Sequence, residues 1–127
     1  MQPKWNDNQP IYRQLRDHVI ARILDGDLTE GDALPSVRAV SVEFQLNPIT
    51  VSKAYQTLVD ENLIEKRRGL GMFVRPGAFD RLLASEREQF LAREWPELVE
   101  RMQRMNLEIE TLLAMVNTDQ KEHNNER

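Results

Sequence analysis

The stretch from Asn47 to Tyr55 constrains the fold of this chain more than any other segment. Proline is favoured in the first turn of a helix, where its missing N–H costs nothing, and asparagine is favoured just before it, so we expect a helix to begin at Pro48. After this start, apolar residues recur at helical spacing and must pack inward. The apolar stripe consists of Val51, Ala54, Tyr55, Leu58 and Val59.

The face of this helix opposite the apolar stripe is polar at its beginning. It carries hydroxyls, an amide, one cation and one methyl-bearing side chain, contributed by Ile49, Thr50, Ser52, Lys53 and Gln56. Such side chains suit the base edges and phosphates of a DNA groove. The segment is therefore predicted to be a DNA recognition helix, with Asn47 at its start as a further candidate contact.

The segment just before it predicts a second short helix, which begins around residues 34–36 and has an inward face of Val37, Val40, Ser41 and Phe44. Ser36 and Arg38 lie at its N-terminus, where free N–H groups and the positive end of the helix dipole attract a phosphate. An alternative is that Ser36 only caps the helix and that Arg38 is a solvated surface residue. Because only residues 45–47 separate the two helices, they predict a helix-turn-helix.

An earlier helix is expected from Pro10 to about Gly26, since its apolar residues keep helical spacing up to that glycine. A turn-rich loop over residues 25–32 follows. Trp5 is expected to anchor the N-terminal segment to the domain. His18 lies beside the apolar stripe of the helix and, because it is isolated, is interpreted as a partly exposed helix residue rather than a ligand.

Past Asn62 the pattern changes to two short strands, over residues 63–68 and 72–75, joined by a glycine-bearing tip. Three consecutive cations, Lys66 to Arg68, lead into this tip. Next to a helix-turn-helix, such a hairpin is expected to be a wing that contacts the minor groove or the DNA backbone. The alternative is a solvated edge strand that its charges protect from pairing.

The composition excludes several classes of function. The chain of 127 residues has no cysteine and two isolated histidines, His18 and His123, so it predicts no metal site and no cofactor. No nucleophile lies beside a base at a recognisable spacing, so an enzyme is not expected. Neither a signal peptide nor a membrane span is visible, which predicts a cytoplasmic protein with no membrane partner.

The formal net charge of −4 argues, taken alone, against a nucleic-acid partner. The charge is unevenly distributed, however. Residues 1–77 contain ten Lys or Arg and ten Asp or Glu, whereas residues 78–127 contain seven and eleven. The front part of the chain is thus neutral and can still present a local basic surface.

Pro76 and Gly77 are expected to close the front domain, which divides the chain into a DNA-binding domain over 1–77 and a short helical region over 78–127. One helix is expected up to Glu94, and Pro96 is expected to start another. There the apolar residues follow a heptad pattern at Trp95, Leu98, Met102, Met105, Ile109, Leu112 and Val116. A continuous helix of that length would span roughly 33 Å at about 1.5 Å per residue.

This heptad seam predicts that two chains pair, because one preceding helix is too short to cover it. The fold class is then mainly α with a small β wing: a winged helix-turn-helix followed by a two-helix dimerisation tail. The alternative is that both tail helices fold back on their own domain. The tail is too short for a separate ligand-binding domain, so a small-molecule effector, if one acts, is expected between tail helices or at the dimer interface, near Met102, Met105 and Met115.

Several motifs together resemble the winged helix-turn-helix of GntR-type bacterial transcription regulators. They are Pro10-Ile11-Tyr12-x-Gln14-Leu15, Gly31-Asp32-x-Leu34-Pro35-Ser36-x-Arg38, Asn47-Pro48-x-Thr50-Val51-x-Lys53-Ala54-Tyr55, Leu63-Ile64 and Gly69-x-Gly71-x-Phe73-Val74. The resemblance covers roughly residues 10–75. The form of the third motif and the short tail look like the YtrA subfamily.

The resemblance implies that Ser36 and Arg38 touch backbone or base, that Thr50, Ser52 and Lys53 read the major groove, and that Arg68 and Gly69 reach the minor groove. This chain departs from relatives at Pro48 and Ile49, where Ile49 can instead meet a thymine methyl. The implied function is a dimeric repressor at a palindromic operator, with half-sites about 34–36 Å apart. The rival hypothesis is a protein-interaction module, which the net charge favours.

Overall fold

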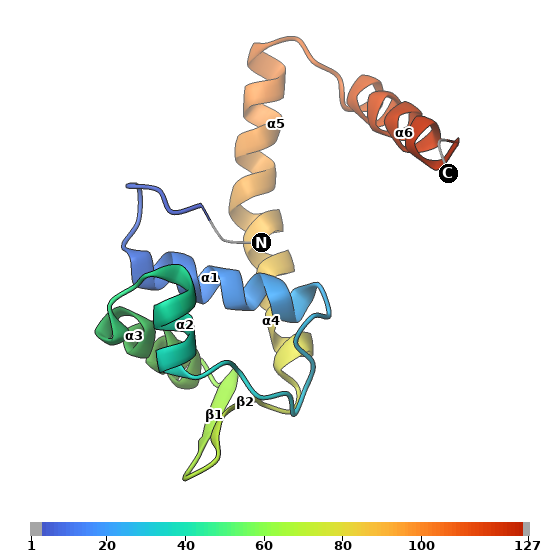
Figure 1. Cartoon of the computed structure of the whole chain (residues 1–127). Coiled ribbons are helices and arrows are strands. Elements are labelled where there is room, and N and C mark those ends of the chain that lie inside the picture. Colours follow the sequence, from blue (N-terminus) through green and yellow to red (C-terminus); the bar gives the residue numbers. More distant parts are fainter. Residues whose placement is uncertain (1–3, 126–127) are drawn as a thin grey trace. The chain divides into compact units, whose positions relative to one another are not determined.

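The computed structural model describes residues 4–125, with side chains up to residue 118, in two compact units, Met1–Ser85 and Glu86–Arg127. The first unit, here the winged unit, contains α1 (Ile11–Leu24), α2 (Val37–Phe44), α3 (Pro48–Asp60), β1 (Ile64–Arg67), β2 (Gly71–Val74) and the start of α4 (Ala78–Gln89). The second, here the tail unit, contains the segment η1 (Phe90–Glu94), α5 (Trp95–Arg104) and α6 (Ile109–Asn125). Figure 1 labels the helices and strands.

The core of the winged unit forms around α3, which packs against α1 and α2. The predicted apolar stripe is confirmed, since Val51, Ala54, Tyr55 and Leu58 are at most 1% exposed. They meet the buried side of α1, formed by Leu15, Val19, Ile20 and Ile23, and Val40 of α2. The N-terminal segment also joins this core, as expected, because the Trp5 ring packs edge-on against Phe44 at 6.1 Å between ring centres.

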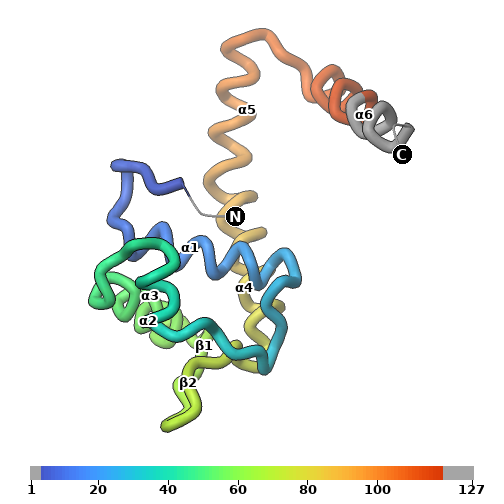
Figure 2. Tube along the Cα trace, in the orientation of Figure 1, coloured from blue at the N-terminus to red at the C-terminus, as the bar shows by residue number. Residues whose placement is uncertain are grey.

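Local hydrogen bonds fix the helix-turn-helix. The Ser36 hydroxyl accepts a hydrogen bond from the Ala39 N–H at 3.0 Å, and the Asn47 side-chain oxygen accepts one from the Ile49 N–H at 2.9 Å, so each caps a helix start. Gln45 adopts a left-handed conformation at φ 56° and closes α2. The chain then turns directly into α3, a path that the trace in Figure 2 shows.

The wing is a two-stranded antiparallel sheet, as predicted, in which Ile64 pairs with Val74 and Arg67 pairs with Gly71. Its base is more strongly anchored than the sequence indicated. The segment Gly31 to Leu34 hydrogen-bonds along β2, through the Leu34 N–H to the Met72 carbonyl and the Val74 N–H to the Asp32 carbonyl. The loop that precedes α2 therefore holds the wing and the recognition helices in one unit.

The start of α4 is part of the winged unit. Ala78 and Leu82 are buried in its core, and the Arg81 guanidinium donates a hydrogen bond to the Asn62 carbonyl at 2.5 Å. The compact unit accordingly extends to Ser85. Of the apolar residues at the start of this helix, Ala78 and Leu82 belong to the domain core, whereas Phe79 and Leu83 are exposed.

The tail unit differs from the expected continuous heptad helix, which was a wrong prediction. α5 ends at Arg104, and Asn106 at φ 56° forms a left-handed turn in which the Leu107 N–H bonds back to the Met102 carbonyl at 2.9 Å. Asparagine tolerates this conformation better than other non-glycine residues, and such a turn ends a helix. The seam residues are therefore divided between two helices.

The predicted start of a helix at Pro96 agrees with the element boundary, because η1 ends at Glu94 and α5 begins at Trp95, although the helical backbone continues through it. α4 passes through the π-helical segment η1 into α5, with Pro96 in the first turn of α5. A proline ring clashes with the carbonyl four residues earlier and provides no N–H for it. The wider π turn accommodates this local defect without ending the helix.

The central position of α3 makes a direct prediction about stability. Leu58 is fully buried, so Leu58→Ala is expected to lower the free energy of unfolding by about 2–5 kcal/mol. The matched change Val42→Ala, at a position 73% exposed, should alter it by no more than about 0.5 kcal/mol. Urea denaturation followed by circular dichroism measures both, and equal losses in the two variants would contradict this core.

Candidate nucleic-acid interface

The exposed face of α3 carries most of the residues predicted to read DNA. Ile49 is 76% exposed, Ser52 and Lys53 are exposed, and Thr50 is half-buried. None of the buried positions of α3 interrupts this face, because the helical period separates the two sides. Asn47 differs from the others, since its side-chain oxygen caps the helix, which is sufficient reason for an asparagine there.

The N-terminus of α2 lies next to this helix. Tyr55 of α3 donates a hydrogen bond from its hydroxyl to the Pro35 carbonyl at 2.6 Å, which fixes the residue just before the Ser36 cap. The Arg38 guanidinium is exposed and has no hydrogen bond or ion pair within the described residues. Ser36 is thus a cap, as the alternative interpretation held, while its hydroxyl proton remains available to an acceptor outside the protein.

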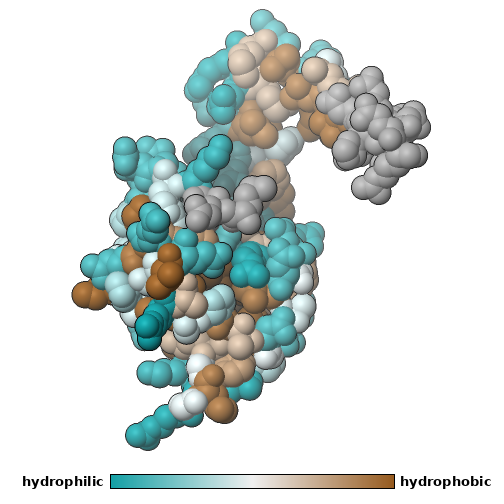
Figure 3. All heavy atoms as spheres, in the orientation of Figure 1, coloured by the Kyte–Doolittle hydropathy of each residue, from teal (hydrophilic) through white to brown (hydrophobic). Residues whose placement is uncertain are grey.

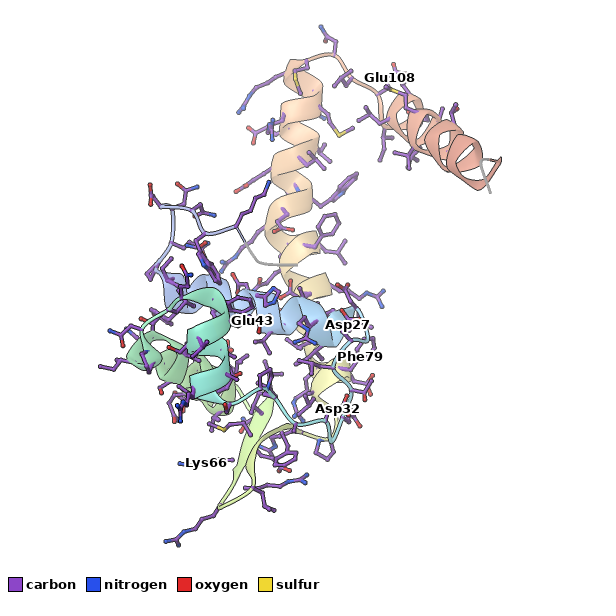
Figure 4. All side chains as sticks on the ribbon, in the orientation of Figure 1. Asp27, Asp32, Glu43, Lys66, Phe79 and Glu108 are labelled. Carbon is purple, nitrogen blue, oxygen red and sulfur yellow. The ribbon has the colours of Figure 1, made fainter. Side chains whose placement is uncertain are left out.

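The cations of the wing are not equivalent. Arg67 is occupied, because its guanidinium forms an ion pair with Glu65 at 2.8 Å and lies 4.3 Å from the centre of the Phe73 ring. In contrast, Lys66 and Arg68 are exposed, and no ion pair or hydrogen bond of their side chains is found in residues 4–118. Figure 4 shows Lys66 extending from β1.

The period of a strand places Lys66 on the side of the wing that faces the helices. Side chains two residues apart share one face of a strand, so Lys66 extends on the same side as Ile64, which is buried against the helical core. At the tip, Gly69 has φ 78° and no atom within 4 Å of the position a β-carbon would take. The tip is therefore open for close approach by another molecule.

A cluster at the start of α1 joins the edge of this face. The Lys53 ammonium lies 4.1 Å from the centre of the Tyr12 ring, and the Arg13 Nε donates a hydrogen bond to the Tyr12 hydroxyl oxygen at 3.3 Å. Lys53 is therefore held toward α1. Since Arg13 already donates to that oxygen, the Tyr12 hydroxyl proton is free to donate elsewhere, as to a phosphate.

The residues predicted to form the dimer seam are mostly exposed within one chain. Met102 is buried and Trp95 and Leu112 are half-buried, whereas Leu98, Met105, Ile109 and Val116 are between 36% and 55% exposed. Leu107, Leu113 and Met115 add to the exposed apolar surface. In the tail unit of Figure 3, hydrophobic side chains gather on one side and hydrophilic ones on the other.

Other classes of site find little support among the described residues. In that part of the chain, no group of three His, Asp or Glu side chains is arranged to hold a metal ion, and no helix is long and apolar enough to cross a membrane. His18 contacts Phe44 edge-on at 5.9 Å between ring centres, and burial together with the nearby Arg22 charge lowers its pKa. His123 lies outside the side chains that the structure describes.

Three helices, the tight turn between α2 and α3 and a two-stranded basic wing define a winged helix-turn-helix protein, a class that binds DNA. The sequence model of the family described as "Bacterial regulatory proteins, gntR family" matches residues 11–74. The chain belongs to the GntR family, and it is a DNA-binding transcription regulator.

Individual relatives agree with this assignment. The HTH-type transcriptional regulator YhcF of Bacillus subtilis is 31% identical over 119 residues, which cover 93% of this chain and 96% of that protein. The transcriptional repressor YtrA of Bacillus subtilis is 42% identical over 69 residues, which cover 54% of this chain and 53% of that protein. The structure of a GntR family regulator from Listeria monocytogenes gives a TM-score of 0.73 at 25% identity, covering 90% of this chain and 98% of that one.

Sequence reasoning missed Tyr12, Arg13 and Lys66 as candidate contacts. Tyr12 and Lys53 are far apart in the sequence, and no periodic pattern relates the start of α1 to α3. Lys66 could have been found, because strand alternation separates it from Arg67 in the run of three cations. Within the described residues, Arg67 is occupied and Lys66 is not, because Arg67 contacts Glu65 and Phe73, two residues that pair across the sheet.

The two tyrosines of the chain offer a test of this geometry by titration. The hydrogen bond from Arg13 lowers the Tyr12 pKa below 10.0, whereas burial raises the Tyr55 pKa to about 12. Ultraviolet absorbance should therefore show two ionisation steps. Tyr12→Phe should remove the lower step and Tyr55→Phe the upper one, and a single step near 10.0 for both phenols would contradict the structure.

The same titration predicts how the stability of the folded protein changes with pH. Because the folded-state pKa of Tyr55 lies above the ordinary value of 10.0, its contribution to stability is present below pH 10 and is lost as pH rises toward 12. Circular dichroism recorded alongside the absorbance separates ionisation of the folded protein from unfolding at high pH.

Proposed function

We propose that the protein is a homodimeric repressor of the YtrA subfamily that binds a palindromic operator. The observation that carries the proposal is a set of exposed cations, Arg38, Lys66 and Arg68, for which residues 4–118 provide no hydrogen-bond or ion-pair partner, around the exposed face of α3. Unpaired cations beside a helix that fits the major groove are what phosphate and base contacts require. The segment of 42% identity to the repressor YtrA supports the subfamily and the repressor role.

Each candidate residue takes a specific role in this proposal. Ser36 and Arg38 bind a phosphate or a base at the start of α2, and Thr50 and Ser52 read the major groove. Ile49 contacts a thymine methyl, because its exposed side chain offers only apolar surface. Asn47 acts chiefly by capping α3.

The cations at the two edges of α3 act on the DNA backbone and the minor groove. Lys53, held against Tyr12, and Arg13 bind a phosphate at one groove edge, to which Tyr12 also donates its hydroxyl proton. Lys66 binds a phosphate on the other side, and Arg68 with Gly69 enters the minor groove. Since the winged unit has little excess positive charge, binding depends on where these cations lie.

Dimerisation is proposed through the exposed apolar residues of the tail unit. Leu98, Met105, Ile109 and Val116 would be covered by a second copy, together with the more buried Trp95, Met102 and Leu112. A twofold dimer presents two recognition helices to half-sites about 34–36 Å apart, which explains a palindromic operator. We place this activity in the cytoplasm, where a bacterial regulator meets the chromosome.

The DNA contacts are tested by replacing the unpartnered arginines. Arg38→Ala and Arg68→Ala should each weaken binding to the operator by about tenfold, because each loses a charge-assisted contact. Arg87→Ala is the matched control, since Arg87 is an exposed arginine that is not among the residues proposed to contact DNA. Fluorescence anisotropy with a DNA fragment selected from the host genome measures the affinities.

The dependence of binding on salt distinguishes the rival function. Contacts to six or more phosphates should weaken affinity on the order of a thousandfold between about 50 and 200 mM salt. Unchanged affinity in both arginine variants would refute the residue assignments. Absent or salt-insensitive DNA binding would instead favour the protein-interaction module.

The proposed dimer is tested with charged substitutions in the seam. Leu98→Glu combined with Ile109→Glu should convert the dimer to a monomer at micromolar concentration, because two carboxylates per chain would be buried at the interface. Analytical ultracentrifugation measures the mass, and Glu97→Gln serves as a control on the polar side of α5. A monomeric parent protein, or a double variant that remains dimeric, would exclude this seam as the interface.

A further inference from the structure

The winged unit contains a pocket of about 460 Å³ that the DNA-binding proposal does not use. It lies where α1, α2 and α3 meet, and not in the tail, where an effector was expected. Its apolar lining includes Leu15, Val40 and Phe44, and the side chain of Tyr55 reaches it from α3. A concave site of this size, lined by both apolar and polar side chains, is of the kind that binds small molecules.

An arginine without a protein partner lies in this pocket. The half-buried Arg22 side chain has no hydrogen bond or ion pair within the described residues. Its charge acts on two rings of the lining: with burial it lowers the pKa of His18, and it opposes the burial that raises the pKa of Tyr55 to about 12. Since Arg22, His18 and Tyr55 all line the pocket, this guanidinium is available to an anionic group bound there.

Carboxylates line another part of the same pocket. Asp25 and Asp27 follow the end of α1 and are exposed, and no side-chain partner of either is found in residues 4–118. Glu43 of α2 also lines the pocket. Figure 4 shows Asp27 in the loop after α1 and Glu43 on α2. Among the described residues, the lining thus offers one cation with no hydrogen-bond or ion-pair partner, carboxylates and apolar side chains.

We propose that this pocket binds a zwitterionic effector with an apolar body, an α-amino acid with a hydrophobic side chain or a short peptide of such residues. The ligand carboxylate binds Arg22, its ammonium group binds Asp25 or Asp27, and its side chain lies against Phe44, a half-buried ring of the lining. A simple organic acid leaves the aspartates unpaired, and a simple amine is repelled by Arg22.

The pocket is connected to the DNA-binding face through Tyr55. The Tyr55 hydroxyl donates to the Pro35 carbonyl at 2.6 Å, and Pro35 precedes the Ser36 cap of α2. Because Arg22, Pro35 and Tyr55 line the same pocket, a carboxylate bound there would compete with the Pro35 carbonyl as the stronger acceptor for the Tyr55 hydroxyl. Loss of the bond to Pro35 frees the segment that positions Ser36 and Arg38, so the ligand lowers operator affinity. This coupling rests on the proposed function, whereas the binding site itself does not.

The site is tested first on the full chain without DNA. L-phenylalanine should shift the amide NMR signals of residues lining the pocket, and hydrocinnamate and phenethylamine, which lack the ammonium and the carboxylate respectively, should bind at least about tenfold more weakly. This comparison needs no variant. If L-phenylalanine, L-leucine and L-leucyl-L-leucine all leave these signals unchanged at millimolar concentration, the proposal is wrong.

Variants then locate the site. Arg22→Gln should weaken L-phenylalanine binding by about tenfold or more through the lost charge, and Ala21→Trp should block the pocket from the exposed side of α1. Arg87→Gln and Ala84→Trp are the matched controls on α4. Circular dichroism verifies folding, and equal affinity of Arg22→Gln and the parent protein overturns the assignment.

The coupling is measured with operator DNA. Saturating L-phenylalanine should reduce operator affinity by about tenfold in the parent protein and have little effect in Arg22→Gln. If the ligand binds but operator affinity does not change, the proposed coupling is wrong, whereas the proposed binding site is retained. Absent operator binding together with intact ligand binding overturns the proposed function instead, so the two failures are distinguishable.

Discussion

The burial of one side of α3 is the constraint on which the rest of the winged unit depends. Val51, Ala54, Tyr55 and Leu58 fill the space between α1, α2 and the base of the wing, and this packing determines which side chains of α3 face outward. A single hydrogen bond from Tyr55 to Pro35 then fixes the start of α2. The same residue therefore serves the core, the geometry of the helix-turn-helix and the wall of the pocket.

The winged unit could be predicted well because its elements are marked by local chemistry. Pro48 and Asn47 define where α3 begins, Gly26 lies just beyond the end of α1, and glycines mark the hairpin tip. These signals act within a few residues of the structure that they specify. The exposure of the α3 face followed from the helical period alone, although its contacts with DNA stay a prediction.

The tail shows where such reasoning fails. A heptad pattern shows which residues lie on the same side of a helix. The same spacing in the sequence can continue across a turn between two helices, so the pattern alone does not reveal the turn. Asn106 was the local sign of the interruption, since asparagine adopts the left-handed conformation readily. Two other features could not be predicted either, the cation–π contact between Lys53 and Tyr12 and the pocket between the first three helices. Each depends on contacts between distant parts of the chain.

The alternation of charges along β1 makes the wing unusually sensitive to insertions and deletions. Glu65 and Arg67 neutralise each other on one face, while Lys66 lies on the other. Inserting one residue between Ile64 and Glu65 would reverse the faces, so that the paired arginine would point toward the helices and the lysine away from them. This strand should consequently tolerate substitutions far better than insertions or deletions.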